Sequence, residues 1–192
     1  MLIVENDPER VEADLRAGAI GCPACGGTLA RWSFGRRRRV RDETGVVEFR
    51  PRRGRCRSCG KTQVLLPDVV LGRRVDTVAV IGRALRAAAG VGHRKAAEMV
   101  GRPASTVRGW LRRFRAVTAR VAVHFTIWAH VLDPNLGPVE PAGSAVADAL
   151  QAIGVAARAA SLRLGPRPAW SWVSVLTVGG LLSNTSSPWL RS

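Results

Sequence analysis

The sequence predicts an α+β protein that is mainly α-helical, with a small β region near the N-terminus followed by helices. Residues 22–64 alternate between polar and apolar side chains around a turn at Asp42–Gly45, a pattern typical of paired strands. From Asp76 onward, apolar residues recur at intervals of three and four, as they do in amphipathic helices. These patterns divide the chain into four regions, residues 1–20, 21–75, 76–132 and 133–192.

Residues 1–20 are expected to form a short strand and a helix. Met1–Val4 is an apolar run. Asp7 is a suitable N-cap, Pro8 suits the first helical turn, and Gly18 is a typical helix end. The start lacks the basic segment that opens a signal peptide, so we expect an intracellular chain.

Residues 21–75 contain all four cysteines in two Cys-x-x-Cys pairs, Cys22 with Cys25 and Cys56 with Cys59. The segments "LARWSFGRRRRVR" and "VVEFRPRRGR" between them read as two strands of a basic hairpin, which would bring the pairs face to face. A glycine after each pair eases the tight turn. The pattern predicts a structural zinc ion held by four thiolates in a zinc ribbon. A redox pair or free thiols are the alternatives, but a redox pair needs one Cys-x-x-Cys at a helix N-terminus.

Residues 76–132 are expected to hold three helices. Asp76 or Thr77 can cap the first, which Gly90–Gly92 ends. "HRKAAEMV" forms a short second helix, and the pattern from about Ala104 continues as one long helix that "DPNLGP" stops at Asp133–Pro138.

The second and third of these helices have the spacing of a helix-turn-helix. Ala97, Gly101 and Val107 occupy the positions of the small residue, the turn glycine and the buried residue of the second helix. The alternative is an ordinary helical hairpin with a solvated basic face. In the helix-turn-helix interpretation the helix opening at Ala104 enters the major groove. The candidate DNA contacts here are Arg94, Lys95, Arg102, Ser105, Thr106, Arg108, Arg112 and Arg113.

Residues 133–192 are expected to cap the core or to form a homodimer. "GSAVADALQAIGVAARAASLRLGP" predicts a small-residue helix, with Asp148 near its start and Arg163 near its end, as the helix dipole favours. "AWSWVSVLTVGGLLS" fits a strand or a buried helix, and the tail "SNTSSPWLRS" an irregular end. Trp170, Trp172 and Trp189 would carry any protein-partner surface, although such residues are more often core.

The charge distribution points to a polyanionic partner. The formal net charge is +16: residues 21–75 carry +10, residues 76–120 carry +8, and the remaining residues together carry −2. Charge confined to one region indicates a binding surface, and double-stranded DNA is the expected partner. The apolar run Ala169–Leu182 is shorter than the roughly 20 residues that span a bilayer, so we expect a cytoplasmic, nucleoid-associated protein without a membrane partner. The hairpin candidates for phosphate contact are Arg36, Arg37, Arg38, Arg39, Arg52, Arg53 and Arg55.

The order of these motifs resembles a known arrangement. "CPAC", "RRRRVR", "RGRCRSCGK" and "HRKAAEMVGRPASTVRGWLRRF" are similar to the N-terminal part of transposases that carry a zinc ribbon before a helix-turn-helix, and to short uncharacterised bacterial proteins of the same plan. The resemblance covers about Gly21–Arg120 and implies zinc at the four cysteines and DNA reading by the helix that opens at Ala104.

The resemblance stops before any catalytic domain. Such transposases continue into a ribonuclease-H-like domain whose carboxylates bind two metal ions. Beyond Arg120 this chain offers only Asp133, Glu140 and Asp148. We therefore expect a DNA-binding protein that is not an enzyme, with a transcriptional or mobile-element role. A zinc-stabilised protein-interaction module and a non-autonomous transposase or nuclease fragment are the alternatives.

Overall fold

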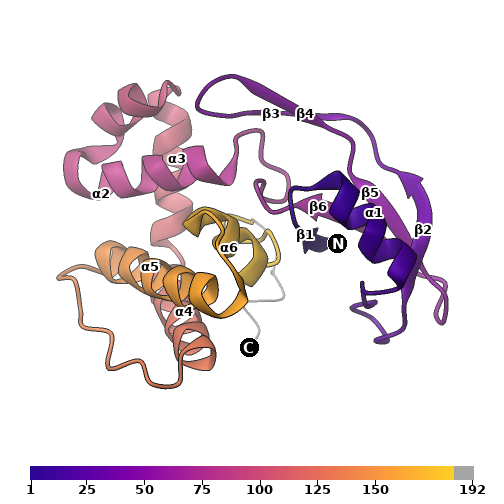
Figure 1. Ribbon diagram of the computed structural model, residues 1–192. Coiled ribbons are helices and arrows are strands. Elements are labelled where there is room, and N and C mark those ends of the chain that lie inside the picture. The colour runs from indigo at the N-terminus through magenta and orange to yellow at the C-terminus, as the bar shows by residue number, and fades with distance from the viewer. Residues whose placement is uncertain (184–192) are drawn as a thin grey trace.

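A four-stranded sheet forms the N-terminal part of the molecule in the computed structural model, which describes residues 1–183 (Figure 1). The strand order is β1-β6-β5-β2, with β1 parallel to β6 and the other pairs antiparallel. The strands are β1 (Leu2–Val4), β2 (Leu29–Phe34), β5 (Arg52–Cys56) and β6 (Thr62–Pro67). Helix α1 (Pro8–Ala17) packs Val11 and Leu15 against Leu29 and Leu65, which gives this part its own small core.

The caps expected for the first helix are confirmed. The Asp7 carboxylate accepts hydrogen bonds from the backbone N–H groups of Glu9 and Arg10 at 2.9 and 3.2 Å. Gly18 ends α1 in the left-handed conformation, with φ of 72°. Both ends of α1 thus follow from local sequence.

The predicted hairpin is confirmed, but each of its arms is broken into two strands. The arms run through β2 and β3 (Arg38–Arg41), and back through β4 (Val46–Phe49) and β5. The outer part, β3 paired with β4, is a separate two-stranded ribbon that reaches from the sheet toward α2 and α3 (Figure 1). Its turn closes through the Asp42 N–H, which donates to the Gly45 carbonyl at 2.7 Å. We call β3, this turn and β4 the arginine arm.

The helical part contains α2 (Val78–Val100), α3 (Ala104–Arg115), α4 (Thr118–Leu132), α5 (Ala145–Leu164) and α6 (Ala169–Leu176). Thr77 caps α2, and Gly92, at φ 78° and ψ 166°, divides it into the two helices that the sequence predicts. Gly101 ends the second in the left-handed conformation.

The expected single helix from Ala104 to Leu132 is wrong, because the chain breaks between α3 and α4. Val117 has φ of −128° and ψ of 5°, and the Thr118 hydroxyl donates to the Arg115 carbonyl at 3.2 Å. The buried positions Phe114, Thr118 and Val121 keep helical spacing across the break, so the periodicity does not reveal it.

The C-terminal region and α2–α4 share one hydrophobic core. Small residues of α5, among them Ala149 and Ala156, lie in the same core as Val121 and Phe125 of α4. The segment that fitted a strand or a helix is the buried helix α6. Its Trp170 lies against Gly82 of α2, where an added Cβ would come within 2.0 Å of the indole ring.

Helix α5 is long and apolar enough, by length and composition alone, to cross a membrane. Core helices pass the same test, and the alanine face of α5 is buried in the core shared with α4. Apart from Ser183, the expected irregular tail lies outside the described residues, and so does Trp189.

Candidate metal centre and basic surface

The four cysteine sulfurs form one cluster. The Sγ atoms of Cys22 and Cys59 are 3.8 Å apart, those of Cys25 and Cys56 are 3.5 Å apart, and all four lie within 4.8 Å of one another. A tetrahedral zinc ion with Zn–S bonds of about 2.3 Å holds its sulfurs about 3.8 Å apart. The cluster therefore has the donor set and the dimensions to bind a metal ion.

Two equivalent turns position these sulfurs. In the first, the Gly26 N–H donates to the Cys22 carbonyl at 2.8 Å; in the second, the Gly60 N–H donates to the Cys56 carbonyl at 3.1 Å. Gly26 and Gly60 have φ of 72° and 71°, a conformation that glycine adopts without strain. Each turn buries its first cysteine and exposes its second.

The thiols differ in acidity. Backbone N–H groups of Cys59 and Ser58 outweigh burial and lower the pKa of Cys56 to about 6. The Gly27 N–H acts to lower the pKa of Cys25, but hydrogen bonds with the Cys59 and Cys56 sulfurs prevail and raise it to about 11. The Cys56 thiolate thus forms readily, whereas a nearby cation would favour ionisation of Cys25, as in a metal site.

The arginines beside the second cysteine pair contact helix α1 and the sheet, and not the sulfurs. Arg52 forms an ion pair with Glu12 at 2.5 Å, Arg53 donates to the Thr62 hydroxyl at 3.3 Å, and Arg55 lies over the Trp32 ring at 4.7 Å. Across residues 1–183, no hydrogen bond or ion pair joins these three arginines to a cysteine. Arg52 is largely buried by its ion pair, so its guanidinium is less available to a partner than that of Arg55.

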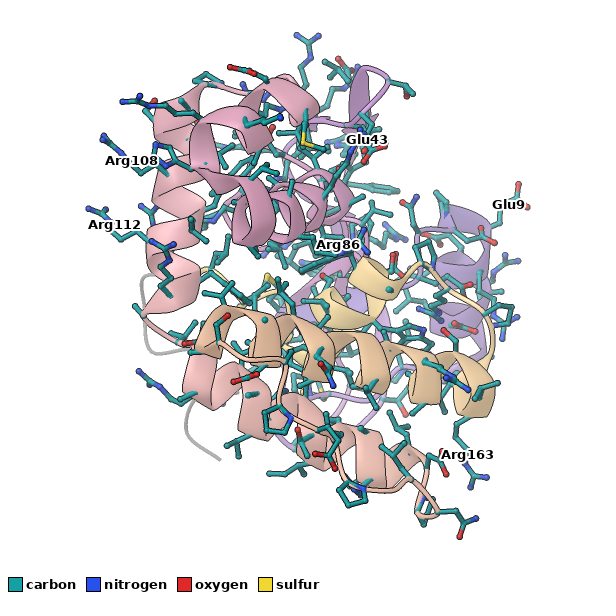
Figure 2. The ribbon with its side chains drawn as sticks, turned by 90° about the vertical axis from the view of Figure 1, so that its left-hand side faces the viewer. Glu9, Glu43, Arg86, Arg108, Arg112 and Arg163 are labelled. Atoms are coloured by element: carbon teal, nitrogen blue, oxygen red, sulfur yellow. The ribbon has the colours of Figure 1, made fainter. Side chains whose placement is uncertain are left out.

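Helix α3 has one buried apolar face and one exposed basic face. Val107, Trp110, Leu111 and Phe114 are buried. Arg108, Arg112 and Arg115 are exposed, and Figure 2 shows Arg108 and Arg112 projecting from the same side, away from the rest of the molecule. An exposed cationic face on the second helix of a tight pair can approach a polyanion without rearrangement.

The turn between α2 and α3 has the geometry that the spacing predicted. Ala97 is 3% exposed and Val107 is fully buried where the two helices pack. Gly101, at φ 61°, donates its N–H to the Ala97 and Glu98 carbonyls. Arg94 and Lys95 are exposed on the helix before the turn.

Arg102, expected among the DNA contacts, is instead committed inside the protein. Its Nε donates to the Asp76 carboxylate at 2.6 Å and its NH2 to the Asp42 carbonyl at 2.9 Å. The side chain is only 11% exposed, and Asp76 is also paired with Arg41 at 2.8 Å. These contacts remove Arg102 from the candidate surface and make it the residue that ties the arginine arm to the helical turn.

The four consecutive arginines before the arm turn have different surroundings. Arg36 is exposed, and Arg37 and Arg39 are exposed residues that pair with Glu48 at 3.2 and 2.8 Å. Arg38 is half-buried and donates to the Arg74 carbonyl at 3.1 Å. The exposed three can still meet a polyanion, because surface ion pairs exchange readily.

A cleft of about 290 Å³ lies between α3 and the segment that joins the sheet to α2. Arg41, Arg73 and Arg74 line this cleft but were not among the residues predicted from the sequence, since no local pattern links them. We call it the arginine cleft; its charged and hydroxyl lining is Arg41, Arg73, Arg74, Asp76, Ser105, Thr106 and Arg113.

The carboxylates considered for catalysis do not assemble. Asp133 accepts from the Asn135 N–H, and Asp148 accepts from the Ala142 N–H at 2.6 Å. Across residues 1–183, the cysteine cluster is the one group of three or more metal-ligating side chains close enough to share an ion. Trp170 and Trp172, considered for a partner surface, are buried in the core.

A model of a protein family described as a domain of unknown function, DUF6431, matches residues 22–110. The match begins at the first cysteine and ends within α3, so it includes both the cysteine cluster and the turn between α2 and α3. No curated protein and no solved structure matches the chain.

Proposed function

We propose that this chain is a DNA-binding protein in which a zinc ion at the four cysteines stabilises a ribbon and α3 reads duplex DNA. The observation that carries the proposal is the exposed basic face of α3, opposite a fully buried apolar face and behind a glycine turn. The N-terminal half of α3, with Ser105, Thr106 and Arg108, would face base edges. Arg112 and Arg115 would contact phosphates.

The zinc ion would be structural. All four ligands come from the protein, so the site has no open position for a substrate. The residues on α3 and the arginine arm, and not the metal, would meet the DNA. Transcriptional regulation and a mobile-element, transposase-like role would both use such an architecture, and we propose neither catalysis nor a membrane partner.

The test compares matched arginine variants in binding to a mixture of random duplexes. Arg108→Ala with Arg112→Ala removes two cations from α3, and Arg163→Ala removes one at the opposite end of the molecule (Figure 2). We expect the double variant to lose about tenfold or more in affinity, because charge-assisted hydrogen bonds are worth about 1.5–3 kcal/mol each. Equal binding by the double variant and by the Arg163 variant would exclude α3 as the reading helix.

A zinc-stabilised protein-interaction module is the second candidate. Val123, Ile127 and Val131 favour it, since they form a stripe on α4 and are 61%, 57% and 62% exposed. A second copy of the chain would suit such a stripe. Sedimentation tests this second candidate. If the α4 stripe forms a dimer interface, Ile127→Ser should dissociate the dimer and leave the DNA affinity of each chain unchanged.

A further inference from the structure

The arginine cleft joins three segments that are distant in sequence. Arg41 comes from the arginine arm, Arg73 and Arg74 from the segment before α2, and Arg113 from α3. Ser105 and Thr106 line the same cleft from the first turn of α3. Four cations and two hydroxyl groups therefore surround one space.

The negative charge in the cleft is already neutralised. Among the described residues that line the cleft, Asp76 is the one acidic residue, and it is 2% exposed and paired with both Arg41 and Arg102. The charge left facing the space is therefore positive.

Several donor groups of the residues that line the cleft are uncommitted. Within residues 1–183, neither Arg73 nor the hydroxyls of Ser105 and Thr106 take part in a hydrogen bond or an ion pair, and the buried Nε of Arg74 has no partner. The NH2 of Arg74 does have one, since it donates to the Leu182 carbonyl. Arginine Nε–H and hydroxyl groups donate hydrogen bonds that a phosphate oxygen can accept.

The cleft also contains a charge repulsion that an anion would relieve and one strained backbone conformation. Burial lowers the pKa of Arg74, and the positive charge of Arg113 lowers it further, which indicates repulsion between the two guanidinium groups. Arg73 has φ of 60°, a conformation that residues other than glycine and asparagine rarely adopt. Strain of this kind is typical of binding sites.

We propose that the arginine cleft binds one phosphate group, held by Arg73, Arg74 and the hydroxyls of Ser105 and Thr106. The proposal rests on the proposed function where the phosphate belongs to a DNA backbone, and it then makes the segment before α2 an anchor that sets the register of α3. A free phosphate-bearing ligand presents the same chemistry, so the test includes both sources.

The first experiment titrates the full chain with inorganic phosphate and follows the backbone amide chemical shifts by NMR. We expect saturable shifts at residues 73–75 and 104–106, with affinity about tenfold weaker in Arg73→Asn and in the uncharged pair Ser105→Ala with Thr106→Val. Asn accepts the left-handed backbone, so Arg73→Asn should retain its melting temperature. Arg163→Asn is the matched control and should bind as the wild type does. Shifts of equal size and affinity in all variants would overturn the proposal.

The second experiment measures the binding of duplex DNA by the same proteins. If the DNA backbone is the source, Arg73→Asn lowers affinity about tenfold and reduces the salt slope by about 0.9, the value for one phosphate. If the wild type binds DNA with a steep salt dependence and Arg73→Asn leaves that affinity and slope unchanged, the cleft does not bind a DNA phosphate. The proposed function would then remain intact. Phosphate binding in the cleft without any duplex binding would support a free ligand and overturn the proposed function.

Discussion

Arg102 is the residue with the largest structural role that its sequence context does not reveal. Its guanidinium connects three places: Gly101 in the turn after α2, Asp76 just before the start of α2, and Asp42 in the turn of the arginine arm. Its substitution should therefore affect stability more than binding.

We predict that Arg102→Ala destabilises the protein by about 2 kcal/mol, because Asp76 stays buried and, among the described residues, keeps only Arg41 as an ion-pair partner. Chemical denaturation measures the free energy of unfolding. Arg94→Ala, an exposed residue on the preceding helix, should change it by less than about 0.5 kcal/mol. Equal stabilities of the two variants would contradict this role for Arg102.

His124 gives the fold a pH dependence. Its Nε2 lies 2.9 Å from the Leu176 carbonyl, and burial lowers its pKa below the usual value. The unfolded chain therefore binds the proton more readily, so stability is complete above about pH 6.5 and falls as the pH drops further.

His124→Gln should flatten this dependence between about pH 7 and pH 5.5, since glutamine does not titrate. Thermal melts at matched zinc content measure the pH dependence of stability. His93→Gln provides the control, because His93 is a half-buried histidine elsewhere, in α2. A wild-type slope that persists in His124→Gln would show that another group is responsible.

Local sequence predicted those features in which neighbouring residues determine the backbone. Asp7, Gly18 and Thr77 act within one turn of their helices, and the cysteine pairs with their glycines form turns that need no distant partner. Arg102 and Arg73 depend on residues brought together only by the tertiary fold, so their surroundings could not be predicted from spacing.

At the scale of elements, the packing of α6 on α2 decides what the apolar C-terminal segment becomes. The pattern around Trp170 fits a strand as well as a helix, and Gly82 provides the contact that accommodates the buried indole. The break between α3 and α4 was missed for a related reason, because the buried face continues through it.

Gly82→Ala should destabilise the protein by about 1–3 kcal/mol, since the new methyl group would overlap the Trp170 ring. Gly154→Ala is the matched control: Gly154 lies in the interior of α5, and within residues 1–183 no atom comes within 4 Å of the added Cβ. This variant should be neutral or stabilising by up to about 1 kcal/mol. Denaturant unfolding compares them. Destabilisation of both variants alike would indicate a general intolerance of alanine and not the contact with Trp170.

At the scale of the whole molecule, the cysteine cluster and the helices stabilise different cores. Cys22 and Cys56 belong to the small core with Leu15 and Leu29, and the large helical core contains no cysteine among the described residues. Arg102 and the arginine arm connect the two parts.

Chelation should therefore release one zinc ion per chain and unfold mainly the ribbon. We expect hydrogen exchange to accelerate at residues 22–29 and 56–61, while the far-ultraviolet helical signal changes little. Cys25→Ser should bind zinc more weakly and show the same local exchange in the presence of the metal. Collapse of the helical signal on chelation would contradict the separation into two cores.

The central claim is that the zinc-loaded chain binds duplex DNA through its arginines. Its most direct test is the dissociation constant for a random duplex, measured from low to physiological salt. Binding through the α3 face predicts a straight line of log affinity against log salt, with a slope of about −0.9 for each phosphate contacted and a total of at least about three contacts. Absence of binding at low salt, or affinity that salt leaves unchanged, would contradict the account.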